Sequence, residues 1–410
     1  MGNRADWTFM VFMAGDNSLS AAGEIDLDEM RQVGSSDRVN VLVEFDNARN
    51  LGTRRIRIAK NGVGEFVESL GETDSGSPEV LSGFITWAAE NYPADRYALI
   101  LWNHGGGWEP SEIDLIARAV ASPGYDGREL AERSASPLGR VFFRSSLKEI
   151  FSLSGPTERA ICSDDGSGHS LDTIELGKVL AAGAEAIGQP FDLLGMDACL
   201  MSNLEVAYQV RDHVRFIVAS EENEPGNGWP YDRILGRLVG NPGIATADFA
   251  GSIVTDYIAW YGARNPDAIV TQAAMDPGRL PLLTGPLDEL AGRLSAGMTE
   301  LYRDIWQAQR KAARFWNNTL WDLGHFCREL GQSSQLAGIG AAAEAVWAAL
   351  EPGHGRLLVA ESHRGAKVRQ CRGVTIYLVP PITEISRYYR ELDFALNHAW
   401  TRVLDDYHAV

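Results

Sequence analysis

The sequence of 410 residues predicts an α/β protein with a mostly parallel central sheet flanked by helices, followed by a mainly helical C-terminal region. Short, nearly uninterrupted apolar runs are typical of strands that are buried on both faces of a parallel sheet. Helical patterns separate these runs along the chain, which favours a doubly wound layer arrangement. After about residue 240 the sequence becomes rich in Ala, Leu and Trp, which predicts the helical region.

The expected elements follow one another in the order that such an arrangement needs. Buried strands are expected at Trp7–Met13, Val39–Phe45, Tyr97–Trp102, Phe191–Met196 and Val214–Ala219, and a half-exposed or edge strand at Thr53–Ile58. Helices are expected at Ser18–Val33, Pro78–Tyr92, Leu171–Ile187 and Leu200–Asp212. Ser77 before Pro78 is a favourable pair for the start of a helix.

The pattern of strands and helices is interrupted between Trp108 and Ala160. This stretch contains several prolines and glycines and seven basic residues, so we interpret 109–160 as a long surface insertion that is functional or disordered. Residues 1–240 are therefore expected to form the α/β domain, and 241–410 the C-terminal helical region. Strands near 356–360 and 373–379 are expected to return from that region to the sheet.

Composition excludes several classes of protein. The formal charge of −18 argues against a nucleic-acid binder and favours a basic partner, although an acidic solvated surface explains it equally well. No apolar run reaches the roughly 18 residues of a membrane span. The first apolar run begins at Trp7, which leaves no room for a signal peptide, so a cytoplasmic protein is expected unless a leader was removed, in which case it is secreted. The four cysteines lack metal or disulfide spacing, and Cys162, Cys327 and Cys371 are expected to be small buried hydrophobes.

Two apolar runs end at a reactive side chain. The run Tyr97–Trp102 is followed by His104, and the run Phe191–Met196 is followed by Cys199. If both are parallel strands of one sheet, their carboxyl ends lie on the edge where open α/β sheets bind ligands. Neighbouring strands lie only about 4.8 Å apart, so imidazole and thiol would share one site. A cysteine beside a histidine is the minimal apparatus for nucleophilic acyl transfer.

The residues around this pair suggest further roles. Glycines follow His104, and the backbone N–H groups of Gly105 and Cys199 are candidates for an oxyanion hole. A helix starting at Cys199 would lower the pKa of its thiol. An incidental histidine and a buried structural cysteine are the alternatives. Asp197 is either a helix cap or a carboxylate that pairs with a basic side chain.

The other titratable clusters are weaker candidates. His169 and His213 compete for the role of base, although both residues lie where surface histidines are common. Asp164, Asp165 and Glu175 do not have the spacing of an EF-hand loop, so calcium has no specific motif in its support.

The segments WNHGGGW and MDACLMSNLEVAYQV, together with FMAGDNSL, VASEENEPGNGWPY and GVTIYLVP, resemble the clostripain family of cysteine peptidases, in the caspase-like clan. The resemblance covers nearly the whole chain and implies a caspase-like fold without a required cofactor. It implies that His104 is the general base and Cys199 the nucleophile of a dyad. It further implies cleavage after Arg or Lys, with Asp197 at the base of the specificity pocket and Glu221 as a second acidic residue.

The resemblance also implies maturation by self-cleavage between the histidine and the cysteine, with Arg140, Arg144 and Lys148 as candidate sites. The expected partner is a protein or peptide that contains basic residues, for example an intracellular target that is activated by cleavage. Two rival functions stay open: a regulatory or catalytically silent module that binds basic peptides in an acidic cleft, and a cysteine amidase that acts on small amides.

Overall fold

The computed structural model describes residues 4–47, 52–108, 161–162, 170–315 and 319–410. Within these residues, nine strands form one central sheet. They are β1 (Ala5–Gly15), β2 (Val39–Asn47), β3 (Thr53–Arg57), β4 (Phe66–Gly71), β5 (Ala94–Trp102), β6 (Leu193–Asp197), β7 (Ile217–Ala219), β8 (Val270–Met275) and β10 (Leu358–Arg364).

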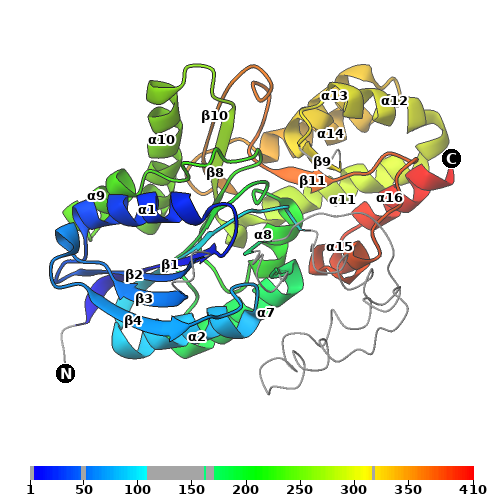
Figure 1. The fold of residues 1–410 in the computed structure, drawn as a ribbon. Helices are drawn as coiled ribbons and strands as arrows, with labels where there is room; N and C mark the ends of the chain where they lie inside the picture. Colours follow the sequence, from blue (N-terminus) through cyan, green and yellow to red (C-terminus); the bar gives the residue numbers. More distant parts are fainter. Residues whose placement is uncertain (1–3, 48–51, 109–160, 163–169, 316–318) are drawn as a thin grey trace, which may run out of the picture.

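The strands lie in the order β10-β8-β7-β6-β5-β1-β2-β3-β4. Figure 1 labels strands from both ends of this sheet, β10 and β8 at one end and β1 to β4 toward the other. The five strands from β7 to β2 are parallel, and antiparallel strands extend the sheet at both edges. The order along the chain reverses between β1 and β5, which is the point where open α/β sheets bind their ligands. The predicted fold class is therefore confirmed.

Helices cover both faces of the sheet (Figure 1). One face carries α1 (Ser20–Val33), α9 (Tyr231–Gly240) and α10 (Thr246–Arg264), and the other carries α2 (Pro78–Asn91), α7 (Thr173–Ile187) and α8 (Leu204–Val210). Side chains of β1 alternate between these layers: the ring of Phe9 lies 6.5 Å from Phe249 of α10, and the ring of Phe12 lies 6.1 Å from Phe84 of α2. The near-continuous apolar run of β1 thus reflects burial on both faces.

The C-terminal part is mainly helical but contributes strands in two places. Its elements besides β8 and β10 are α11 (Pro281–Ala296), α12 (Met298–Lys311), β9 (Leu320–Asp322), α13 (Leu323–Ser333), α14 (Ile339–Ala349), β11 (Thr375–Tyr377), α15 (Asp393–Asn397) and α16 (Trp400–Ala409). The strand expected near 356–360 joins the edge of the main sheet as β10. The strand expected at 373–379 does not: β11 pairs with β9 in a separate two-stranded sheet.

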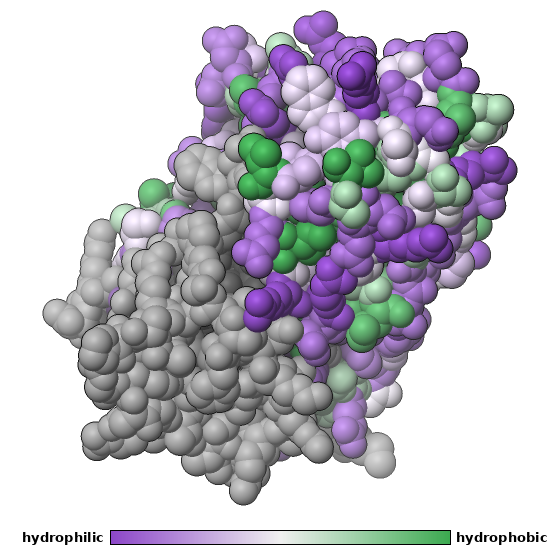
Figure 2. Space-filling model, turned by 90° about the vertical axis from the view of Figure 1, so that its right-hand side faces the viewer, coloured by the Kyte–Doolittle hydropathy of each residue, from purple (hydrophilic) through white to green (hydrophobic). Residues whose placement is uncertain are grey.

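The main sheet therefore continues past residue 240, because both β8 and β10 belong to it. In the described part of the chain, no helix is both long enough and apolar enough to span a bilayer. Figure 2 shows one face of the molecule, on which hydrophobic side chains form small separate patches among hydrophilic ones. This mixture agrees with the 22% of charged residues in the sequence.

Candidate active site

The structure brings His104 and Cys199, the two residues that the sequence predicts to react, to the same edge of the sheet. Strands β5 and β6 are adjacent and parallel, and Trp102 at the end of β5 lies opposite Asp197 at the end of β6. His104 and Cys199 each follow two residues after this matched pair. They consequently leave the sheet at the same level, on neighbouring strands.

The backbone of Gly105 packs directly against the backbone of Cys199. A Cβ atom built on Gly105 would lie 2.2 Å from the carbonyl oxygen of Cys199 and 3.1 Å from its nitrogen, so only glycine fits at this position. This contact joins the loop that carries His104 to the turn that carries Cys199. The glycine run after the histidine thus has a steric explanation as well as a catalytic one.

Cys199 lies in a turn of strained backbone. Leu200, the next residue, has a φ of 65°, a conformation that non-glycine residues rarely adopt and that recurs at functional sites. The backbone N–H of Glu224 donates to Sγ of Cys199 at 3.3 Å. The N–H groups of Gly105 and of Cys199 itself also favour the thiolate. Three backbone donors thus point toward the sulfur.

The prediction of a helix that begins at Cys199 is wrong. Helix α8 begins at Leu204 and is capped by Asn203, whose Oδ1 accepts the N–H of Val206 at 3.1 Å. The thiol therefore does not lie at a helix N-terminus. Burial raises its pKa, and the nearby charge of Asp197 raises it further, against the lowering effect of the three backbone donors.

His104 is held from the loop that follows β1. Its Nε2 lies 3.0 Å from Oγ of Ser18. The preceding residue, Asn103, donates to the carbonyl oxygen of Ala14 at 2.6 Å and accepts from Asn17 at 3.3 Å. The ends of β1 and β5 are thereby tied together at the point where the strand order reverses. Sequence reasoning missed Ser18 and Asn103 as partners of this histidine.

Asp197 lies two residues before Cys199 and is almost completely buried, with 4% of its surface exposed. Its Oδ2 accepts from the hydroxyl of Tyr231 at 2.9 Å and from the N–H of Trp229 at 3.1 Å. Burial raises its pKa despite these donors. The alternative interpretation of Asp197 as the cap of the following helix is wrong, because Asn203 has that role.

A second carboxyl group beside Asp197 comes from Glu224, which the sequence analysis did not select. A hydrogen bond joins the carboxyl groups of Glu224 and Asp197, and burial together with the charge of Asp197 raises the pKa of Glu224. Oε1 of Glu224 also lies 3.4 Å from Nε1 of Trp229. Glu224 thus contacts Cys199 through its backbone and Asp197 through its side chain. Glu224 lies within the motif SEENEPGNGWPY, and this is the feature of the sequence that could have identified it.

The structure places Glu221 in a different cluster. Its Oε2 accepts the N–H of Gly373 at 3.0 Å, and its carboxyl group faces Asp322 and Cys371 in a fully buried group. Burial and the charge of Asp322 raise the pKa of Glu221. Glu221 is therefore not brought together with Asp197, because its side chain turns toward the C-terminal segment.

The other candidate residues of the sequence analysis have structural roles or lie outside the described residues. Glu175, considered for calcium, forms a capping box with Asp172 at the start of α7. Within the described residues, the one group of three side chains spaced for a metal ion is Glu221, Asp322 and Cys371. Arg140, Arg144 and Lys148, as well as Asp164, Asp165 and His169, lie outside the described residues.

Comparison with known proteins places this arrangement in a family. The model of the clostripain family matches residues 11–130 and 151–407. Clostripain of Hathewaya histolytica is 29% identical over 272 residues, which are 59% of this chain and 44% of that protein. The chain thus spans less than half the length of this curated relative.

Two solved structures are similar over almost their whole length. A secreted cysteine protease of this family from Bacteroides thetaiotaomicron, in complex with an irreversible peptide inhibitor, has a TM-score of 0.63 and 20% identity, with 97% of this chain and 99% of that chain covered. An inactive zymogen protease of the family from Parabacteroides distasonis has a TM-score of 0.63 and 19% identity, with 98% and 99% covered. At this identity the two structures establish the shared fold.

Proposed function

Because this chain belongs to the clostripain family of cysteine peptidases, we propose that it is an endopeptidase that cleaves after arginine or lysine through a dyad of His104 and Cys199. The observation that carries the proposal is the contact between the backbones of Gly105 and Cys199, which joins the loop that carries His104 to the turn that carries Cys199. The curated relative at 29% identity, clostripain, supports the same activity.

The proposed reaction follows from the contacts of the sulfur. Because burial raises the pKa of the Cys199 thiol, the thiol proton passes to His104 as the sulfur attacks the peptide carbonyl. The N–H groups of Gly105 and Cys199 stabilise the oxyanion of the tetrahedral intermediate. His104 then protonates the leaving amine, and a thioester acyl-enzyme remains. Water, activated by His104, releases the acid and restores the thiol.

The acidic group below the nucleophile supports the proposed specificity. Asp197 and Glu224 are two carboxyl groups in a largely dehydrated environment, and no lysine or arginine of the described chain is among the groups that shift their pKa values. A buried carboxylate without a cation is costly, whereas the ion pair it forms with arginine or lysine is strong. We therefore assign the second acidic position to Glu224 in place of Glu221.

A digest of a peptide library tests the proposal directly. Wild-type protein should cut after arginine and lysine, and Cys199→Ala should lose this activity, since the acyl-enzyme cannot form without the thiol. Asp197→Asn should cleave basic peptides at least about 30-fold more slowly, in line with the 2–5 kcal/mol typical of a lost buried charge pair. Cleavage by Cys199→Ala at the wild-type rate would refute the dyad, and an unchanged preference in Asp197→Asn would refute the pocket.

The wild-type and Cys199→Ala proteins also test whether the chain matures by self-cleavage. We propose that the dyad also cuts its own chain between His104 and Cys199, at Arg140, Arg144 or Lys148. On a denaturing gel, wild-type protein should give two fragments and Cys199→Ala a single band. A fully active wild-type protein that remains one intact band would contradict self-cleavage.

A further inference from the structure

Asp26 is a buried carboxyl group to which neither the sequence motifs nor the reaction above gives a role. It lies on α1, far in sequence from both reactive residues, and only 1% of its surface is exposed. We propose that Asp26 is an additional carboxyl group of the basic-residue site beside Asp197, and that it gives up a proton when the cationic side chain of the substrate binds. The inference rests on the proposed function and deepens it.

Hydrogen bonding connects Asp26 to the strand end that carries the site. Nε1 of Trp102 donates to Oδ2 of Asp26 at 2.6 Å. Trp102 is the last residue of β5 and the direct neighbour of Asp197 on β6. The carboxyl group of Asp26 therefore lies over the same end of the sheet as Asp197, on the face covered by α1.

Gly228 shows that the two aspartates face one point. A Cβ atom built on Gly228 would lie 3.0 Å from Oδ2 of Asp197 and 3.2 Å from Oδ2 of Asp26. Gly228 also has a φ of 55°, so a side chain there would be strained as well as obstructed. The loop that carries Glu224 thus brings a residue without a side chain to the place where both carboxyl groups converge.

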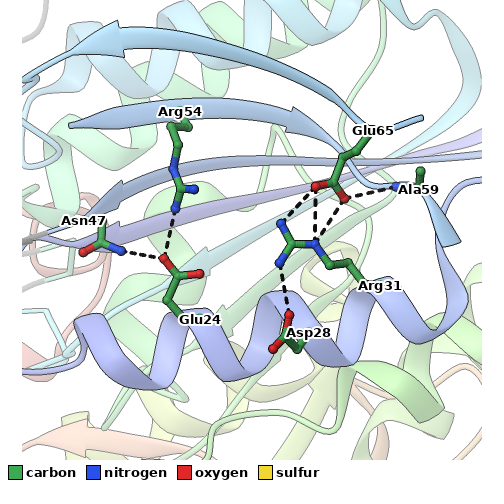
Figure 3. A network of polar contacts seen from close by, with 7 residues as sticks. All are labelled: Glu24, Asp28, Arg31, Asn47, Arg54, Ala59 and Glu65. Carbon is green, nitrogen blue, oxygen red and sulfur yellow. Dashed lines mark hydrogen bonds and ion pairs between the residues drawn. The ribbon is translucent and has the colours of Figure 1, made fainter. Parts of the chain in front are cut away.

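Ion pairs fix the helix that carries Asp26. Figure 3 shows that Arg31 of α1 bonds to Glu65, at 2.9 Å between Nη2 and Oε2, and that Glu24 of α1 accepts from Arg54 at 3.0 Å. These contacts hold α1 against β3 and the segment that precedes β4. Because these two ion pairs anchor the helix, the carboxyl group of Asp26 is preorganised and need not move to meet a ligand.

Within the described part of the chain, the groups that act on the pKa of Asp26 are acidic or neutral. Burial and the charge of Asp197 raise the pKa of Asp26 to about 9, with a further contribution from Glu29. No lysine or arginine of the described chain is among the groups that shift it. At neutral pH Asp26 therefore holds a proton, and a guanidinium cation between the two carboxyl groups would take the place of that proton. The titratable groups that act on or face Asp26 are Asp197, Glu29, Tyr231 and Tyr261.

Tyr257 provides a buried hydroxyl near Asp197 and Glu224 that has no hydrogen-bond partner among the described residues. Tyr257 of α10 is fully buried, and its hydroxyl makes no hydrogen bond among the described residues. The charges of Glu224, Asp197 and Cys199 all act on it. A buried polar group without a partner costs about 1–3 kcal/mol, which a donor supplied by a bound guanidinium would offset.

Binding of n-butylguanidinium, a cation that mimics the arginine side chain, tests the proposal without peptide cleavage. The affinity is measured by calorimetry on the full-length Cys199→Ala protein between about pH 6 and pH 9.5, in buffers of different ionisation enthalpy. Because the raised pKa of Asp26 opposes binding below about pH 9, affinity should rise with pH by up to about tenfold per unit for each proton released, and Asp26 should contribute one of these protons.

Asp26→Asn on the same background is the informative variant, because its amide oxygen can still accept from Trp102. It should bind like its parent near pH 7, where Asp26 is protonated, and at higher pH its affinity should rise less steeply, with one proton fewer released, because only Asp197 and Glu224 still titrate. Asp28→Asn, at an exposed position on the same helix, should follow the parent throughout.

Two results would overturn the inference while the proposed function stands. The first is binding that Asp197→Asn abolishes but that has the same pH profile in the parent and in Asp26→Asn. The second is binding by the parent without proton release, which does not depend on how the variant folds. If the parent binds no guanidinium cation at any pH, the basic-residue site itself is refuted.

Discussion

At the scale of single residues, the site depends on a few backbone contacts that no side-chain motif reveals. The sequence predicted that His104 and Cys199 share a sheet edge, because each follows a buried strand of similar length. It could not identify Glu224 as the partner of Cys199 and Asp197, since a loop conformation selects Glu224 over Glu221. The sequence analysis also predicted a lowered pKa for the Cys199 thiol, whereas the pKa is raised. This prediction failed because α8 begins later than the apolar pattern indicated.

Gly105→Ala tests the closest of these contacts. Its new Cβ atom would lie 2.2 Å from the carbonyl oxygen of Cys199, so the nucleophile turn must move. A displacement of this size should lower kcat/KM for an arginyl peptide by at least about 100-fold, because misplacement by 1 Å is enough for such a loss. Gly226→Ala, where a Cβ atom meets nothing within 4 Å, is the matched control and should retain activity. Equal rates for the two variants would contradict the role of the contact.

At the scale of elements, the sequence predicted most strands of the main sheet, including the partly exposed β3 and β10, but not β4 and β8. The sequence predicted β1, β2 and β5 because their residues are apolar on both faces. Strand β4 escaped prediction because it lies at the sheet edge and most of its residues are exposed. Strand β8 contains polar Thr271 and Gln272, which are buried, so its pattern lacked the continuous apolar run of the other central strands.

At the scale of the whole molecule, the C-terminal part supports the nucleophile turn. The hydroxyl of Ser202 donates to the carbonyl oxygen of Gly373 at 2.6 Å, and the N–H of Thr375 donates to the carbonyl oxygen of Ser202 at 2.9 Å. Asn203, the cap of α8, also bonds to Thr375. Long-range contacts of this kind cannot be read from local patterns. They explain why β11 pairs away from the main sheet, next to the turn it supports.

Glu205 of α8 makes the contact between this helix and the C-terminal residues Tyr377 and Tyr389, here called the junction, sensitive to pH. Its Oε1 accepts from the N–H of Tyr377 at 3.0 Å and from the hydroxyl of Tyr389 at 3.3 Å, and burial raises its pKa to about 7. Because the folded pKa lies above the unfolded one, the favourable contribution is complete below about pH 4.5 and is lost as the pH rises through 7.

Glu205→Gln should remove this dependence, since the amide oxygen can accept both hydrogen bonds and does not ionise. Relative to the Cys199→Ala parent, the variant should gain up to about 3 kcal/mol in the free energy of unfolding between about pH 5 and pH 8. Urea unfolding at several pH values measures the difference, and exposed Glu300→Gln serves as the control. Parallel stability curves for the parent and Glu205→Gln would show that this junction does not titrate.

Covalent labelling by an arginyl chloromethyl ketone tests the central claim most directly, because the reagent needs a basic-residue site, a thiol and a base at one place. Peptide mapping should locate the adduct at Cys199, with chloride displaced by the sulfur, and His104→Ala should slow the reaction at least about 100-fold. The other three cysteines are buried and have raised pKa values, so they should not react. An adduct at one of those cysteines, or labelling of His104→Ala at the wild-type rate, would contradict the dyad.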